Sequence, residues 1–287
     1  MIAAELKNVS HIYSKDTPFE KTAVHDLNIQ FEQGMVTGII GHTGSGKSTI
    51  AQMLCGLLKP ETGSVIVNGR DIWAEPKKIK NVRFEVGLVF QYPEYQLFEE
   101  TVSADIAFGP KNMGISGEEL REKVVEAARF VGISEDLLEK SPFDLSGGQK
   151  RRVAIAGVIA MSPKILILDE PAAGLDPRGR DEILTRIVEY RKNSGSTVII
   201  ISHSMEDMAK YCDRILVMNE GRNFLYGTPN EIFRDAEGIE AVGLSVPQIT
   251  KMMLALRAKG FDVNTAVYTV EDAKKEILGI IGGGKNA

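Results

Sequence analysis

The chain has 287 residues, of which 43% are hydrophobic and 25% charged, with a net charge of −5, and this composition predicts a packed globular protein. The acidic balance argues against broad non-specific binding of nucleic acid, which depends on a basic surface. Cys55 and Cys212 lie far apart and form no metal-binding pair, which fits a reducing compartment. No apolar run approaches the roughly 20 residues of a membrane helix, so a link to a membrane would require a partner.

The first residues predict an antiparallel flap of two strands, over residues 4–13 and 23–32, separated by a polar loop. Tyr13 closes the first strand, where its ring could stack on the face of an adenine. The alternative for Tyr13 is an ordinary aromatic residue at the end of a strand.

The next segment matches the phosphate-binding P-loop pattern G-x-x-x-x-G-K-[ST]. A buried strand is expected over 36–40 and a helix from Lys47, which is the context that the motif requires. Glycines let backbone N–H groups converge on phosphate oxygens, and Lys47 would reach the β- and γ-phosphates while the Ser48 hydroxyl binds Mg²⁺. The residues predicted to bind phosphate are Gly41, His42, Thr43, Gly44, Ser45, Gly46, Lys47, Ser48 and Thr49.

Two further strands are expected, over residues 63–69 and 86–90. Gln91 follows the second strand, where its amide could contact Mg²⁺ or a water bound to the metal. A surface glutamine is the simpler alternative.

A helical pattern begins at Ser103 and continues to about Lys140. Ser116 and Glu119 have the spacing of a capping box, which predicts a helix that runs to about Val131. We interpret residues from about 100 to 160 as an inserted helical subdomain.

A second glycine-rich segment consists of Leu145 followed by Ser146, Gly147, Gly148 and Gln149. A serine and two glycines at a helix start form a nest of N–H groups that suits an anion. Because one P-loop already serves one face of a nucleotide, this second nest suggests contact with a nucleotide held by another chain. An N-capped helix with a flexible lead-in is the alternative.

Residues 165–168 form an apolar run that ends in Asp169, Glu170 and Pro171, which is typical of a buried strand that delivers carboxylates at its carboxyl end. Asp169 is expected in the Mg²⁺ shell, and Glu170 is expected to orient or deprotonate an attacking water. The alternative is that the two carboxylates are simply solvated at the end of the strand. So apolar a strand, halted by Pro171, makes this alternative the poorer one.

Asp176 precedes a helix that starts with Pro177, and by itself it is typical of an N-cap. A buried strand is expected over 197–201, and His203 follows it. A lone histidine is usually a satisfied polar residue, but this one is expected at the same sheet edge as Asp169 and the P-loop, which favours a contact with the γ-phosphate.

The last part of the chain predicts a hairpin over 214–226 and then a change of composition beyond residue 238. Two apolar stripes follow there, which we interpret as internal packing or a dimer surface. Their members are Ile249, Met252, Met253 and Leu256 in the first stripe and Val270, Ala273, Ile277 and Ile281 in the second.

Taken in order, the P-loop, Gln91, the Leu145–Gln149 segment, the 165–171 run, residues 174–176 and His203 resemble the nucleotide-binding domain of ATP-binding-cassette (ABC) proteins. The resemblance implies an α/β P-loop NTPase of the ABC ATPase type, with a parallel-sheet core, an antiparallel β flap and an inserted helical subdomain. It implies a domain over 1–237 and a C-terminal helical extension over 238–287 that contacts a dimer partner.

Residues 18–21, the P-loop, residues 90–98 and residues 246–250 further resemble energy-coupling-factor (ECF) transporters, and most closely the second (A-prime) ATPase of the pair. This resemblance implies an ATP hydrolase that powers uptake of vitamins or metal ions. Ala172 departs from the family pattern, which usually has threonine at that position. Because the two carboxylates themselves are retained, this departure is not expected to impair hydrolysis. The alternatives are the ATPase of a conventional ABC importer with a soluble binding protein and a non-transport ABC ATPase.

In the implied assembly, two ATPases pair head to tail at the cytoplasmic face of the cell membrane. The expected partners are a paralogous ATPase, a transmembrane coupling subunit that docks near Gln91, and membrane-embedded substrate-binding subunits. ATP and Mg²⁺ are the implied cofactors, and no nucleic acid is expected. The residues implied to contact the ATP of the partner chain are Ser146, Gly147, Gly148, Gln149 and Asp176.

Overall fold

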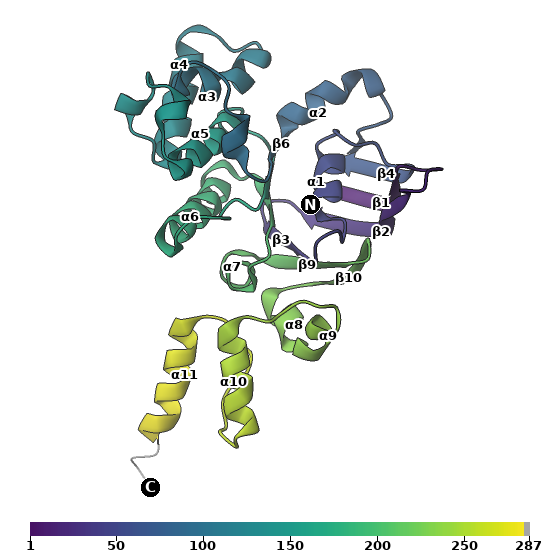
Figure 1. The fold of residues 1–287 in the computed structure, drawn as a ribbon, viewed down its shortest axis with the longest axis vertical. Helices are drawn as coiled ribbons and strands as arrows, with labels where there is room; N and C mark the ends of the chain where they lie inside the picture. Colours follow the sequence, from purple (N-terminus) through teal and green to yellow (C-terminus); the bar gives the residue numbers. More distant parts are fainter. Residues whose placement is uncertain (284–287) are drawn as a thin grey trace.

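The computed structural model describes residues 1–283, which form two β-sheets, a group of helices beside the larger sheet and a pair of helices at the carboxyl end (Figure 1). The strands are β1 (Ile2–Tyr13), β2 (Lys21–Glu32), β3 (Val36–Ile40), β4 (Thr62–Val67), β5 (Arg70–Asp71), β6 (Val86–Val89), β7 (Ile165–Asp169), β8 (Thr197–Ile201), β9 (Arg214–Asn219) and β10 (Arg222–Gly227).

Most of the helices agree with the motifs, caps and periodic patterns of the sequence, although those over 79–85 and 236–241 were not predicted. They are α1 (Lys47–Leu54), α2 (Ile79–Glu85), α3 (Val102–Asn112), α4 (Gly117–Val131), α5 (Gly147–Ile159), α6 (Pro177–Ser194), α7 (Met205–Tyr211), α8 (Pro229–Arg234), α9 (Ala236–Ala241), α10 (Gln248–Ala258) and α11 (Val270–Gly283). Short 3₁₀ turns occur at η1 (Pro76–Lys78), η2 (Pro93–Gln96), η3 (Glu135–Leu137) and η4 (Pro142–Asp144).

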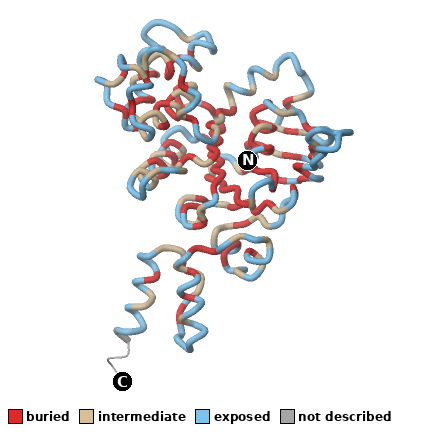
Figure 2. Tube along the Cα trace, viewed as in Figure 1, coloured by how far each residue is buried: buried red, intermediate tan, exposed pale blue. Residues whose placement is uncertain are grey.

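The larger sheet has the strand order β10-β9-β3-β8-β7-β6, and its neighbours from β9 to β6 run parallel. Every residue of β3, β7 and β8 is buried, which explains why these strands are continuous apolar runs rather than alternating ones (Figure 2). The expected parallel-sheet core is confirmed.

The smaller sheet has the order β2-β1-β4-β5 and is antiparallel throughout. It confirms the expected flap. Its buried face encloses α1 together with one face of the larger sheet, in a core that includes Phe31, Ile50 and Ile199. The flap is therefore fixed beside the helix that follows the P-loop.

Helices α3, α4 and α5 pack on one another and form the inserted subdomain. The predicted bounds of α4 are confirmed, but the capping box at its start is wrong. Ser116 is the N-cap residue, yet its side chain makes no capping hydrogen bond. Gly117 follows with φ +65°, so the backbone leaves the path that would bring the N–H of Glu119 to the serine.

Beyond β10, α8 and α9 pack against the main core, while α10 and α11 extend from the body as a separate pair (Figure 1). Both apolar stripes contribute to one small core, which contains Met253 and Ala273. The stripes are not fully covered, because Met252, Val270 and Ile281 are exposed. Helical packing thus accounts for only part of each stripe.

Candidate functional site

The strand order brings the predicted residues together at one edge of the larger sheet. Strand β8 lies between β3 and β7, and β6 lies beyond β7. Because these strands are parallel, their carboxyl ends meet at one edge, which is where ligands bind in such sheets. The result is a cavity of about 290 Å³, lined by Tyr13, Lys21, Ala23, Thr43, Gly44, Gly46, Lys47, Ser48, Thr49, Gln91, Asp169, Glu170 and His203.

The P-loop closes tightly against its neighbours, which explains two of its glycines. A Cβ at Gly41 would lie 2.5 Å from the Met218 carbonyl oxygen, and one at Gly46 would lie 2.5 Å from the Ala23 carbonyl oxygen. Gly46 also has φ +103°, which L side chains rarely adopt. The two glycines therefore let the loop backbone pack directly against β9 and the flap.

Lys47 begins α1 and folds back over the loop. Its Nζ donates to the carbonyl oxygens of Gly41 at 2.7 Å and His42 at 3.0 Å. Burial lowers the pKa of Lys47, while the nearby Glu170 and Asp169 raise it. A buried ammonium group of this kind, beside a helix N-terminus, supplies positive charge where a phosphate would lie.

Ser48 and Asp169 meet although they lie 121 positions apart in sequence. The Ser48 hydroxyl donates to Asp169 Oδ2 at 2.7 Å. Burial raises the pKa of Asp169, and the hydrogen bond from Ser48 opposes that rise. Hydroxyl and carboxylate oxygens are the donors that Mg²⁺ prefers, and Gln91 lines the same cavity with an amide. The donor set fits the predicted metal.

Glu170 follows β7 with φ +52°, and its side chain is 12% exposed. Burial first, and then the charge of Asp169, raise the pKa of Glu170 to about 7. Its Oε1 lies 3.6 Å from His203 Nε2 and has no hydrogen-bond partner within residues 1–283. A carboxylate whose pKa is near neutral and whose oxygen is free has the properties of a general base.

His203 lies at the end of β8, as expected, and its side chain is half-exposed at the cavity wall. Burial lowers the pKa of His203, and Lys47 lowers it further. The imidazole is therefore expected to be neutral at pH 7, so that one ring nitrogen donates a hydrogen bond and the other accepts one.

Tyr13 reaches the cavity from the flap. Its hydroxyl lies 3.3 Å from Thr49 Oγ1, and the ring of His11 packs against its ring edge-on with centroids 4.7 Å apart. These contacts fix the tyrosine ring beside the P-loop while leaving 38% of the residue exposed. The position is compatible with the predicted stacking on an adenine.

The residues implied to act on a partner's nucleotide lie outside this cavity. Ser146 and Gln149 form a reciprocal capping box at the start of α5. Asp176 caps α6 by accepting from the Gly179 N–H at 2.7 Å. Within this chain, Ser146 and Asp176 therefore act as helix N-caps, as the alternative interpretation predicted. Contact of these residues with a nucleotide would require a second chain.

Sequence reasoning missed several residues around the site. Lys21 and Ala23 line the cavity from the start of β2, and Asn219 Oδ1 lies 3.2 Å from His42 Nε2, from which it can accept a hydrogen bond. No local pattern marks them, because their position depends on how the flap and β9 pack against the P-loop. Arg151 belongs to a run of three basic residues over 150–152, a pattern that predicts a solvated helix face, yet it is only 4% exposed.

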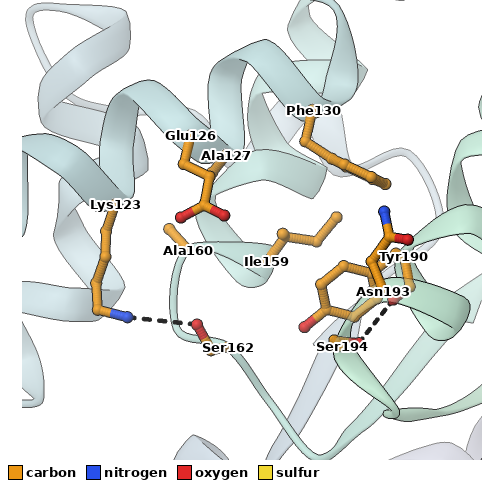
Figure 3. A pocket seen from close by; sticks show the side chains of 10 residues that line it. All are labelled: Lys123, Glu126, Ala127, Phe130, Ile159, Ala160, Ser162, Tyr190, Asn193 and Ser194. Carbon is orange, nitrogen blue, oxygen red and sulfur yellow. Dashed lines mark hydrogen bonds between the residues drawn. The ribbon is translucent and has the colours of Figure 1, made fainter.

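A second cavity, of about 210 Å³, lies between α4, the end of α5 and α6 (Figure 3). Phe130, Ile159 and Tyr190 form its apolar wall. Lys123, the one cation among its lining residues, donates to Ser162 Oγ at 3.4 Å. Lacking a glycine loop, this cavity is a poorer phosphate site than the sheet edge.

Within residues 1–283, no helix has the length and apolar character to span a bilayer.

Comparison with known protein families matches residues 24–173 to the ABC transporter model. The chain is 55% identical to the energy-coupling factor transporter ATP-binding protein EcfA2 of Caldanaerobacter subterraneus, over 98% of this chain and 99% of that protein. It is 51% identical to the protein of the same name from Clostridium tetani, over 97% of each chain.

Solved structures agree with these sequence matches. CbiO1 from Clostridium perfringens, described as part of the ABC transporter complex cbiONQ, is 42% identical, with a TM-score of 0.75 over 88% of this chain and 99% of that chain. A dimer of the ATP-binding cassette MJ0796 bound to ADP and Pi is 27% identical, with a TM-score of 0.71 over 79% of this chain and 98% of that chain. The second of these cassettes was solved as a dimer that holds the products of ATP hydrolysis.

Proposed function

The chain belongs to the ATP-binding proteins of energy-coupling factor transporters, a branch of the ABC family, and from this premise we propose that it binds and hydrolyses ATP to power uptake of a micronutrient through a membrane complex. The observation that carries the proposal is the convergence of Lys47, Ser48, Asp169 and Glu170 on one cavity. Vitamins or transition-metal ions are the proposed cargo. A conventional importer is disfavoured because the matches to EcfA2 proteins span almost the whole chain.

Each side chain of the cavity has a proposed role in phosphoryl transfer, which depends mainly on positioning and on neutralising charge. The P-loop N–H groups and Lys47 would hold the β- and γ-phosphates. Mg²⁺, held by Ser48, Asp169 and Gln91, would neutralise phosphate charge. Glu170 would accept a proton from the attacking water, and His203 would hydrogen-bond the γ-phosphate. Tyr13 would stack on the adenine.

The two remaining features point to a pair of ATPases. Because Ser146, Gly147, Gly148, Gln149 and Asp176 are exposed or half-exposed and lie outside the cavity, we assign them to the nucleotide of a partner ATPase. The relatives include a dimeric cassette and a subunit of a larger transporter. We propose that this partner is a paralogous ATPase and that the two form a head-to-tail dimer. The dimer would lie at the cytoplasmic face of the cell membrane, with the membrane subunits of the transporter docked near Gln91.

The variant Glu170→Gln tests this function. The substitution keeps the size of the side chain but removes the base. The variant should therefore bind ATP and accumulate as a dimer closed around ATP, while its rate of hydrolysis falls by about two orders of magnitude or more. The measurements are ATP binding, dimer formation by light scattering, and phosphate release. The matched control is Glu189→Gln, an exposed residue of α6, which should leave all three unchanged. Hydrolysis at the wild-type rate by Glu170→Gln would refute the assignment.

A further inference from the structure

Arg151 stands out as a buried cation that the proposed reaction does not use. Its side chain is 5% exposed and forms a two-pronged ion pair with Glu94, which is 17% exposed. Arg151 Nε and Nη2 donate to the two carboxylate oxygens of Glu94 at 3.1 and 2.9 Å. The remaining guanidinium nitrogen, Nη1, donates to the carbonyl oxygen of Ala173.

This set of contacts joins three segments that are distant in sequence. Glu94 belongs to η2, which follows Gln91. Arg151 lies one turn into α5, whose N-cap is Ser146. Ala173 lies in the loop between Glu170 and the α6 cap at Asp176. We call the three-way contact of Glu94, Arg151 and Ala173 the Arg151 clasp.

The side chains of the segment over 92–98, which contains η2, differ sharply in exposure. Glu94 points inward to the clasp, while Tyr95 is 85% exposed, Phe98 is 58% exposed and Tyr92 is 49% exposed. A cluster of exposed aromatic side chains is typical of a protein interface. The same short segment therefore faces a candidate docking surface on one side and the interior of the ATPase on the other.

Stability alone does not explain the clasp. A buried ion pair has a desolvation cost that can equal its attraction, and replacement by apolar residues of similar volume is often neutral or stabilising. A neighbouring pair shows the contrast: Arg152 and Glu182 are 20% and 39% exposed and join α5 to α6 without contacting η2. The clasp is distinguished by the segments that it connects.

We propose that Arg151 is a positioning residue that transmits a displacement of η2 to the amino-terminal end of α5 and to the loop over 170–176. A rigid, two-pronged guanidinium contact resists sliding, so movement of Glu94 must carry Arg151 and the Ala173 carbonyl with it. Ser146 lies at the start of α5, and Glu170 and Asp176 lie at the two ends of the loop. Docking of a membrane subunit on η2 would therefore displace both the residue that acts on this chain's own ATP and the residues that contact the partner's ATP. The inference rests on the proposed docking near Gln91.

Hydrogen exchange read by mass spectrometry tests the clasp in the complete transporter. The variant is Arg151→Met combined with Glu94→Leu, which replaces the ion pair by apolar residues of similar size and so should fold. The control is Arg152→Met on the same helix. Amide exchange over residues 92–98, 146–150 and 170–176 is compared between the ATPase pair alone and the pair assembled with its membrane subunits.

In the wild type and in Arg152→Met, assembly should alter exchange in all three segments. In the double variant, residues 92–98 should still be protected, while the change over 146–150 and 170–176 is lost. An unchanged remote response in the double variant, or no remote response in the wild type, overturns the inference. A wild-type complex that leaves residues 92–98 unprotected instead overturns the docking proposal, so the two failures are distinguishable.

Discussion

Glu170 combines three unusual properties in one residue. Its backbone has φ +52°, its carboxylate is nearly buried, and one oxygen lacks a partner within the described part of the chain. Buried polar groups are usually hydrogen-bonded, so a carboxylate with one unpaired oxygen next to Asp169 is costly to the free protein. The strand end holds it in a position where a water near a bound phosphate could satisfy it.

Removal of this carboxylate should therefore stabilise the free protein. The pKa of Glu170 is about 7 in the fold against an ordinary value of 4.5, so folding holds a proton that the unfolded chain releases. The resulting destabilisation is absent below pH 4.5, grows as the pH rises and is complete above pH 7. Glu170→Gln should exceed the wild type in free energy of unfolding by about 1–2 kcal/mol at pH 8, after discounting for partial exposure.

Urea unfolding of both nucleotide-free proteins between pH 4.5 and 8 checks this. The difference in unfolding free energy should widen between pH 4.5 and about 7 and level off above that pH. A constant difference would mean that Glu170 titrates normally and that its environment is more polar than its burial indicates.

At the scale of elements, sequence patterns located the strands well because β3, β7 and β8 are buried on both faces and therefore form unbroken apolar runs. The order of those strands was not available from any local pattern. It is the position of β8 between β3 and β7 that brings Ser48 to Asp169. The orientation of η2 was equally hidden, since the inward turn of Glu94 depends on Arg151 from another element.

The exposed side of η2 gives the prediction at this scale. Alanine at Tyr92, Tyr95 and Phe98 should weaken co-purification with the membrane subunits, because aromatic side chains supply much of the binding energy of interfaces. Hydrolysis by the ATPase pair alone should stay near the wild-type rate. Co-purification and phosphate release measure the two effects, and Phe224→Ala, an exposed aromatic residue on β10, is the control. Undiminished assembly would remove these residues from the docking surface.

For the whole molecule, the motifs predicted the nucleotide-binding domain and its inserted helices, whereas the carboxyl end was ambiguous. An apolar stripe indicates that a helix face is covered but not by what. The structure resolves part of this: Met253, Val263 and Ala273 belong to a small core of their own. Ile239 and Val246, by contrast, belong to the main core although they follow residue 238.

Two truncations separate these arrangements. A chain ending at residue 247 keeps Ile239 and Val246, so it should retain most of the unfolding free energy and the ATP affinity. A chain ending at residue 237, the boundary predicted from sequence, loses both buried side chains and should be less stable by about 3 kcal/mol or more. Thermal and urea unfolding measure the difference. Equal stability of the two chains would show that the segment from α9 to residue 247 belongs to the extension, and that the main core closes without it.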